Sequence, residues 1–214
     1  MSLEDAFRRV ENWLEVHAPR ILHESLQSGA TEPELAELAQ ALGQPLPADY
    51  QDLYRWRNGL DEDADNFGNL FYGLSFTPLA QVLATQQERQ ASEPVPLVHA
   101  QAAVRAENLF NPAWLQLGFD CSHCWLYVDL DPAVAGRYGQ VIFVDEENEA
   151  AFRVAESVEA LLGEFADDLE QGRYQLEPEA LDDGNEYLDA AESIDLVNWY
   201  RAARWQKVLP PAAY

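Results

Sequence analysis

Basic residues are scarce in this 214-residue chain, which has 13 Lys and Arg against 38 Asp and Glu and a formal net charge of −25. A chain with this charge repels phosphate backbones and anionic membrane surfaces, so we expect neither nucleic acid nor membrane as a partner. It attracts basic proteins, with a strength that falls as salt screens the charges. Many acidic proteins are simply well solvated, so the charge alone identifies no partner.

Long apolar runs and cysteine are also lacking. No stretch approaches the roughly 20 apolar residues that a membrane-spanning helix needs. Residues 1–30 contain no apolar segment typical of a signal peptide. Two cysteines do not make a disulfide framework in a chain of this size. We therefore expect a cytoplasmic protein, whose 48% hydrophobic residues are typical of a globular fold.

The sequence contains none of the nucleotide-binding, nucleophile-elbow or zinc-protease motifs. One pair of carboxylates, Asp129 and Asp131, has the i, i+2 spacing that places both on one face of a strand, where they could hold a cation or exchange protons. No recognisable constellation of His, Lys or Ser accompanies them. The sequence favours a turn opened by Asp131-Pro132, and we predict a non-catalytic protein without cofactors.

The segment "CSHC", residues 121–124, has the C-x-x-C spacing of zinc and redox sites. Zinc would need further ligands, and the chain has no second C-x-x-C. His123 lies between the two thiols, where it cannot readily complete a tetrahedral site with both. A redox motif normally precedes a helix, whereas a strand is expected after Cys124. The sequence favours a plain turn with reduced thiols and no metal, and a metal or redox site stays the alternative.

The acidic segment "DEDADN" begins like a calcium loop, with Asp61, Asp63 and Asp65 at the right spacing. However, Asn66 stands where such a loop needs glycine, and Tyr72 stands where it needs a bidentate glutamate. We therefore interpret the segment as an acidic contact surface or a solvated loop.

The first 60 residues predict helices. Thr31 and Glu34 form a capping box, and Gly43 follows the last apolar residue of that helix. Pro47 suits the first turn of the next helix, and Asn58-Gly59 ends it because both residues tolerate positive φ. The expected helices cover residues 2–17, 20–29, 31–43 and 47–58.

The middle of the chain predicts a sheet. A helix with Thr77 as N-cap separates a short strand region from the main strands, and a helix capped by Ser157 follows them. The connections between successive strands are too short for helical crossovers, so we expect an α+β fold with a mostly antiparallel sheet and helices packed around it. The strand regions are 69–76, 113–120, 124–131, 139–145 and 151–155, and the helices are 77–90 and 157–172.

The composition changes after residue 174. Residues 175–193 are strongly acidic, and the remainder to residue 214 is amphipathic and more basic. We predict a domain over 1–174, including the N-terminal helices, and a helical C-terminal extension over 175–214. Trp199 and Trp205 are expected to pack the extension back on the core.

The order of these segments resembles the SUKH superfamily, the group of the fungal Smi/Knr cell-wall-assembly regulators and their bacterial relatives. The resemblance begins with "ELAELAQALGQPLPADYQDLYRWRNGL", a helix, L-G-x-x-L-P, a second helix and N-G. "LFYGLSF", "PLAQVL", "WLQLG", "LYVDLDP", "GQVIFV" and the Ser-capped helix follow in family order, over roughly residues 20–173. Ala39 stands where the family often has glutamate, and "DCSHC" replaces a loop that is usually small and Gly-rich.

The resemblance implies an α+β fold without catalysis. It also implies an immunity protein, because most bacterial members look like proteins that bind and block a toxin, often a nuclease with a basic cleft. The acidic charge fits this role, since an acidic inhibitor mimics phosphates and speeds encounter. We predict a basic toxin domain as the partner, and the contact residues are Trp56, Asp61, Glu62, Asp63 and Asp65.

Arg55 and Arg57 flank Trp56, and we expect them to pair with neighbouring carboxylates rather than with nucleic acid. The alternative function is an interaction scaffold of the fungal-regulator type, which would dock through the extension 175–214. The sequence gives no indication of the oligomeric state.

Overall fold

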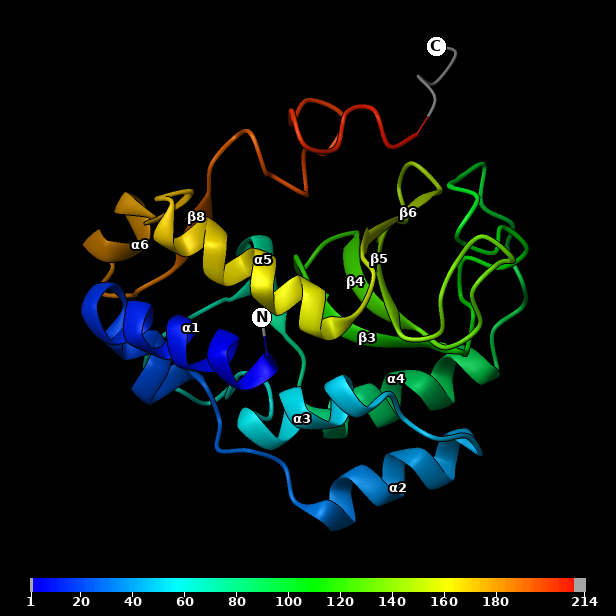
Figure 1. Ribbon diagram of the computed structural model, residues 1–214, viewed down its shortest axis with the longest axis horizontal. Coiled ribbons are helices and arrows are strands. Elements are labelled where there is room, and N and C mark those ends of the chain that lie inside the picture. The colour runs from blue at the N-terminus through cyan, green and yellow to red at the C-terminus, as the bar shows by residue number, and fades with distance from the viewer. Residues whose placement is uncertain (1, 210–214) are drawn as a thin grey trace.

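A mixed six-stranded sheet lies at the centre of the computed structural model, which describes residues 2–209 (Figure 1). The strand order is β1-β3-β4-β5-β6-β2. The neighbouring pairs β1–β3, β3–β4, β4–β5 and β5–β6 are antiparallel. β2 lies at the edge beyond β6 and runs parallel to it, with His99 opposite Ala150. The strands are β1 (Ser75–Phe76), β2 (His99–Ala100), β3 (Trp114–Phe119), β4 (Cys124–Asp129), β5 (Gln140–Asp145) and β6 (Ala150–Ala155).

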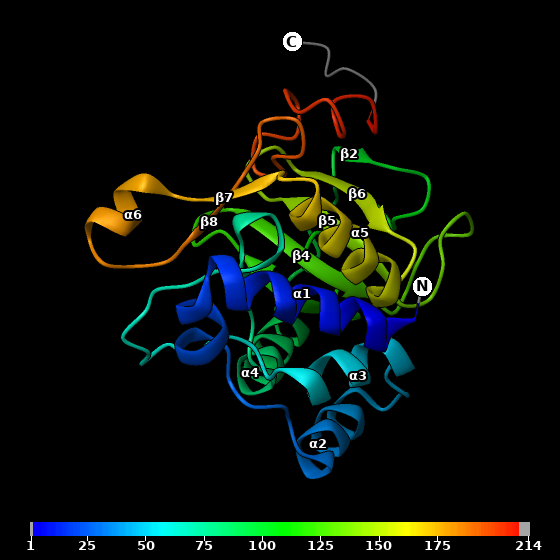
Figure 2. The same cartoon turned by 60° about the vertical axis from the view of Figure 1, so that its left-hand side comes forward.

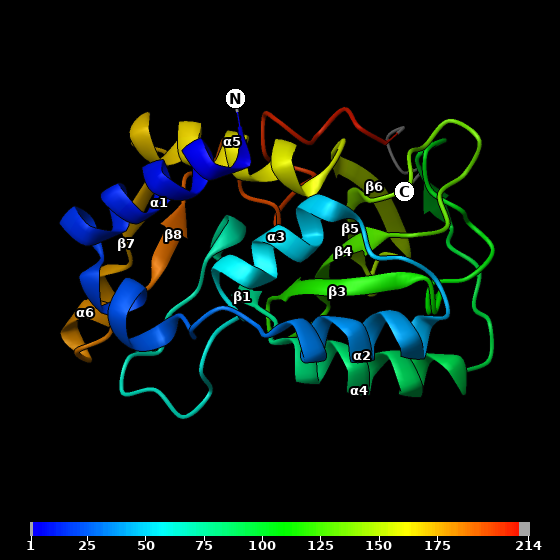
Figure 3. The ribbon, with the colours of Figure 1, turned by 60° about the horizontal axis from the view of Figure 1, so that its bottom comes forward.

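Helices surround this sheet, which confirms the predicted α+β fold. α1 lies along α5, and α2 lies along α4 (Figures 1 and 3). None of the helices within residues 2–209 is long and apolar enough to cross a membrane. The α-helices are α1 (Leu3–His17), α2 (Glu32–Leu42), α3 (Ala48–Trp56), α4 (Leu79–Gln90), α5 (Val158–Glu170) and α6 (Pro178–Asp182), with a π-helical turn η1 (Ile21–Ser25) and a 3-10 turn η2 (Phe71–Gly73).

The two faces of the sheet bury separate apolar clusters, as the alternation of a strand requires. In β4, Leu126 and Val128 belong to the larger cluster beneath the helices, whereas Tyr127 belongs to the smaller one. Leu97, just before β2, and Leu109, in the segment that follows β2, cover that second face. The long apolar strands are therefore buried on both sides.

Most local signals in the sequence are found in the structure. Thr31 and Glu34 make the capping box of α2, and Gly43 adopts the left-handed conformation after it. Asn58-Gly59 has a further role, because Asn58 Oδ1 accepts a hydrogen bond from the first amide of α4, at Leu79. A Cβ at Gly59, where φ is +78°, would lie 2.5 Å from the backbone of Pro78, so only glycine fits.

Two predicted details differ. The strand region over 69–76 contains the turn η2, in which Tyr72 has φ of 55°, and only two of its residues pair with β3. Thr77 was expected to cap α4, but the N-cap is Pro78. The Thr77 side chain is buried instead, where its hydroxyl accepts a hydrogen bond from Gln116. Asn58, rather than Thr77, therefore accepts the hydrogen bond from the first amide of α4.

The extension after residue 174 folds back on the core. β7 (Tyr174–Leu176) and β8 (Leu188–Ala190) form a hairpin, and α6 lies in its loop and projects from one side of the molecule (Figure 2). Residues 193–208, predicted to be helical, form successive turns in the described part of the chain. Trp205 is nevertheless buried, packing edge-on against Tyr72 and near Phe152.

A buried carboxylate fixes the extension to α5. The side chain of Asp168 is 2% exposed, and both its oxygens accept hydrogen bonds from Arg204, at 2.6 and 2.7 Å. Arg173, at the start of the hairpin, bonds the same carboxylate. Two arginines on one acid leave the cluster with a positive charge, so loss of the acid would leave two cations facing each other.

We expect Asp168→Ala to lower the free energy of unfolding by about 3 kcal/mol, because it leaves partly buried arginines uncompensated. Urea denaturation measures this change. Trypsin should then cleave first in the segment that holds Arg201 and Lys207. Glu156→Ala, which removes the half-exposed partner of Arg153, is the control and should cost less than about 1 kcal/mol. Equal costs for the two variants would contradict this account.

Candidate functional site

A groove of about 450 Å³ opens where the acidic loop meets the β1 edge of the sheet. Its lining is mostly apolar. Phe119, at the end of β3, contributes aromatic surface, and the fully buried Phe76, in β1, lies among the lining residues together with Asp61 and Glu62. The groove is lined by residues 60–62, 66–69 and 75–78 together with Gln81, Gln116, Phe119, Cys121 and Tyr187.

The four carboxylates predicted as contact residues lie in this region, and all are exposed: Asp61, Glu62, Asp63 and Asp65. Within the described residues, no basic nitrogen approaches any of them within the 4.0 Å of an ion pair. Arg20 is near enough to Asp65 to interact electrostatically, but its ion pair is with Glu24. The loop, which projects from the fold in Figure 3, therefore presents four carboxylates without an ion pair in the described part of the chain.

The ends of the acidic loop are held firmly. At its start, the amide of Asp61 donates to the Ser25 carbonyl at 2.8 Å, and the amide of Leu60 donates to the Phe76 carbonyl at 2.8 Å. At its end, the buried Asn66 donates to Ser25 Oγ at 2.7 Å, and that hydroxyl donates to the Asn66 carbonyl at 2.9 Å. The single residue Ser25 thus closes the loop from both sides.

Two asparagines join the loop to the C-terminal extension. Asn66 accepts from the Glu186 amide at 2.7 Å and donates to its carbonyl at 3.2 Å. Asn69 makes the same pair of bonds to Leu188, at 2.7 and 2.8 Å. Each side-chain amide thus bonds both the N–H and the C=O of one residue, as the backbone of a neighbouring strand would. Tyr187, which lies between the two bonded residues, lines the groove.

The structure separates Trp56 from the other predicted contact residues. Its ring is half-buried and stacks on Phe7 at 4.7 Å, and its indole N–H donates to Glu11 at 2.9 Å. Arg57 pairs with the same Glu11. Phe67, which the sequence analysis did not single out, is 72% exposed and lines the groove. An aromatic residue within an acidic segment is the signal that could have identified it.

The calcium interpretation of the loop gains no support from the geometry. Asp61 Oδ1 accepts a hydrogen bond from the Asp63 amide, which forms an ordinary turn. Asp61, Asp63 and Asp65 do not converge into a metal-binding group within residues 2–209. Asn66, at the position that needs glycine, is used in the connection to the extension.

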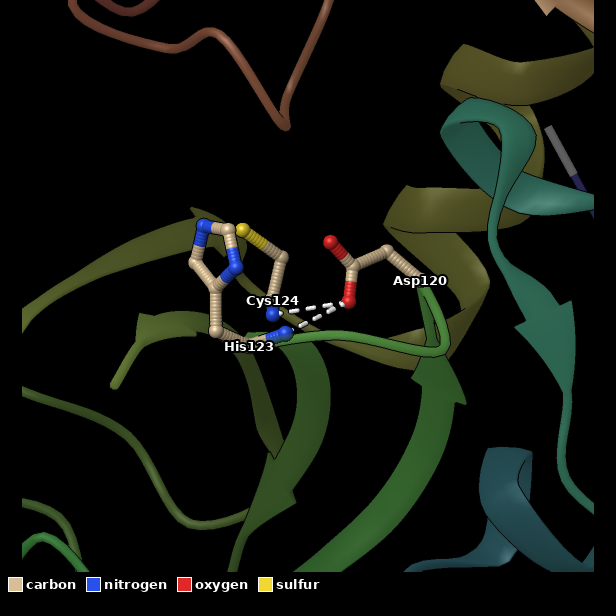
Figure 4. A group of neighbouring side chains, drawn as sticks. All are labelled: Asp120, His123 and Cys124. Atoms are coloured by element: carbon tan, nitrogen blue, oxygen red, sulfur yellow. Dashed lines mark hydrogen bonds between the residues drawn. The ribbon is translucent and has the colours of Figure 1, made fainter. Parts of the chain in front are cut away.

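The "CSHC" segment is a tight turn between β3 and β4, organised by the residue before it. Asp120 Oδ1 accepts hydrogen bonds from the amides of Ser122, His123 and Cys124, at 2.8 to 2.9 Å. Cys121 takes a left-handed φ of 65° in this turn. Figure 4 shows the side chains of Asp120, His123 and Cys124 gathered at the turn. One donor atom of each lies within 4.8 Å of the others, so these residues are the ones that could hold a metal.

The two thiols have different environments. Cys121 is exposed and lines the groove, whereas Cys124 is completely buried. Burial, assisted by the negative charges of Asp120 and Asp145, raises the pKa of the Cys124 thiol well above its ordinary value. In the absence of a metal, Cys124 is therefore neutral and unreactive.

The predicted carboxylate pair is also divided. Asp129 is completely buried, where Oδ1 accepts from the Asp131 amide and Oδ2 accepts from Gln140 Nε2. Asp131 is partly exposed and pairs with Arg105. The chain does turn at this strand end, but Asp129 rather than Asp131 opens the turn, because the Asp129 side chain bonds the backbone two residues on.

Comparison with known families matches residues 29–164 to the SMI1 / KNR4 family (SUKH-1). The chain belongs to this family. The match includes the acidic loop and the β3–β4 turn, and it ends before the hairpin that supplies Tyr187. The resemblance inferred from the order of motifs is thereby confirmed.

Fungal regulators are similar to this SMI1/KNR4 family member. The cell wall assembly regulator SMI1 of Saccharomyces cerevisiae is 24% identical over 86% of this chain and 43% of its own length. The cell wall biosynthesis/cell cycle regulator smi1 of Schizosaccharomyces pombe is 25% identical over 80% of this chain and 37% of its own. A KNR4/SMI1 homolog of Kluyveromyces lactis is 37% identical over 36% of this chain. The chain spans less than half the length of these relatives.

Thiol reactivity should follow the burial of the two cysteines. We expect a maleimide reagent to modify one thiol per native chain, at Cys121, and both thiols in urea. Mass spectrometry of the labelled peptides identifies the site. Cys121→Ser should abolish labelling of the native protein, and rapid native labelling at Cys124 would show that the turn opens.

Burial raises the pKa of Asp129 to about 6, despite the hydrogen bonds from Gln140 and Asp131. A folded-state pKa above the unfolded value means that the group stabilises the fold fully below pH 3.8, and that this contribution is lost as the pH rises through about 6. The loss amounts to about 3 kcal/mol, from about two pKa units.

The measurement compares unfolding free energies of wild type and Asp129→Asn between pH 4 and pH 7. The substitution lowers the unfolding free energy by an amount that does not depend on pH, because an amide nitrogen then faces Gln140. It also removes the carboxyl group that titrates. We therefore expect the unfolding free energy of the wild type to fall relative to that of the variant by about 2.5 kcal/mol between pH 4 and pH 7. A difference independent of pH would contradict the raised pKa.

Proposed function

We propose that this SMI1/KNR4 protein is a non-catalytic binding protein that neutralises a toxin domain by receiving a basic surface of it on the acidic loop and groove. One observation carries the proposal: the exposed carboxylates Asp61, Glu62, Asp63 and Asp65 have no ion-pair partner within residues 2–209 and lie beside a mostly apolar groove. A nuclease domain suits this role, because its phosphate-binding cleft is basic.

The two parts of the surface contribute different terms to binding. Uncompensated charges on a rim raise the association rate with a basic partner, and salt weakens this effect. A desolvated apolar centre supplies most of the residual affinity in protein interfaces. Phe67 and Phe119 provide aromatic surface for such a centre. The arrangement of apolar groove and charged rim corresponds to this division.

A second candidate is an interaction scaffold like the fungal regulators, favoured by the similarity to the cell wall assembly regulator of S. cerevisiae. In this version the extension after residue 174 is the docking element. Because Asn66 and Asn69 bond the extension to the acidic loop, both candidates use neighbouring parts of one surface. Deleting the extension would not separate them, since it would also remove Arg204 from Asp168 and Trp205 from the core.

Neutralising the rim provides the test. If a neighbouring gene encodes a toxin domain, the triple variant Asp61→Asn, Glu62→Gln, Asp63→Asn should bind that domain about tenfold more weakly at low salt, mainly through slower association. Surface plasmon resonance at low and high salt measures both rates. The control variant Glu88→Gln, Glu93→Gln, Glu107→Gln changes the charge equally at exposed positions outside the groove, and should bind like the wild type.

Phe67→Ala tests the apolar part of the same surface. It should speed dissociation at every salt concentration, because the lost contact is not electrostatic. Expression of the wild type should protect cells from the toxin, and the triple acidic variant should protect them less. Equal effects of the acidic and control variants, or no protection from any neighbouring toxin, would exclude the immunity role and leave the scaffold.

A further inference from the structure

The β3–β4 turn gathers three different metal-binding side chains within five residues. One donor atom each from Asp120, His123 and Cys124 lies within 4.8 Å of the other two (Figure 4). Zn²⁺ binds thiolate at about 2.3 Å and imidazole or carboxylate at about 2.0–2.2 Å, so its tetrahedral ligands are about 3.2–3.8 Å apart. Side-chain movements of about 1 Å would therefore bring these donors to coordination distance.

The turn leaves the required atoms accessible to an ion. The three backbone bonds all go to Asp120 Oδ1, so the other carboxylate oxygen remains for a metal. His123 has a hydroxyl neighbour at one ring nitrogen, Ser122 Oγ at 2.8 Å, and Glu147 at 3.5 Å from the other. An ion on either nitrogen leaves the second one oriented by a polar neighbour, as metal-binding histidines usually are.

A further carboxylate lies beside the buried sulfur. Cys124 is completely buried, and its amide donates to Asp120 Oδ1 at 2.9 Å. Asp145 is the residue directly opposite Cys124 in the β4–β5 ladder. A divalent cation bound to the sulfur would offset the negative charge of these carboxylates, which a neutral thiol cannot do.

We propose that Asp120, His123 and Cys124 form a Zn²⁺ site with water at the fourth position. The sequence pattern directs attention to the two thiols as a pair, but the structure replaces Cys121 with Asp120. The ion would hold the turn whose residues Phe119 and Cys121 line the groove. The site does not depend on the proposed toxin-binding role, because its ligands and its test involve no partner protein.

Cobalt titration of tag-free, chelator-treated protein tests the site. We expect one Co²⁺ per chain, with the d–d bands of a tetrahedral site and a thiolate-to-metal charge-transfer band in the near ultraviolet. Zn²⁺ should displace Co²⁺ and raise the melting temperature. Binding of less than one equivalent, or octahedral bands without charge transfer, would overturn the proposal.

Four variants separate this site from other arrangements. Cys124→Ser should abolish the charge-transfer band, and Asp120→Asn and His123→Ala should each weaken Co²⁺ binding at least tenfold. Asp120→Asn keeps an oxygen for the turn's amides, so it tests ligation in a folded protein even if Cys124→Ser is unstable. Cys121→Ser is the matched control and should bind like the wild type. Loss of binding in Cys121→Ser, or full binding in Asp120→Asn, would overturn the proposed ligand set.

Discussion

The candidate surface depends on two buried asparagines. Asn66 and Asn69, each 1% exposed, use their amides as strand-like partners for Glu186 and Leu188, more than a hundred residues away. An unpaired buried amide costs free energy, so the loop and the hairpin order each other. The groove combines residues of the family domain with Tyr187 of the extension. Its shape is thus a product of tertiary contacts rather than of either segment alone.

The distribution of the few arginines explains why the surface is acidic. Arg204 and Arg173 bind Asp168, and Arg9 binds Asp167 and Glu170. Other arginines pair within one helix, as Arg20 does with Glu24, or between elements, as Arg57 does with Glu11. With 13 basic residues against 38 acids, a chain that uses its arginines as internal connections leaves most carboxylates free. The four acids of the loop have no ion-pair partner within residues 2–209 and lie within five residues of one another, which concentrates the field beside an apolar groove. This combination favours a basic protein partner over a merely solvated loop.

Local signals were predicted well because their causes are local. The capping box at Thr31 and the stop at Asn58-Gly59 depend on backbone geometry within a few residues. The four acidic contact candidates were also visible in the sequence, although their function remains a proposal. The groove was not predictable, since it needs Phe119, Tyr187 and the loop to meet in space. The fold of residues 193–208 was missed for a related reason: Trp205 and Arg204 are satisfied by the core, and no helix is required there.

The β3–β4 turn connects the proposed metal site to the proposed binding surface. Phe119 and Cys121 line the groove, while Asp120 and Cys124, their neighbours in the same turn, supply two of the three ligands. Phe119 stacks on Trp125 at 3.7 Å, so this wall is already braced on the strand side. An ion would brace its tip as well. Fewer conformations of the wall mean a smaller entropic cost when a partner enters the groove, so metal would favour binding without contacting the partner.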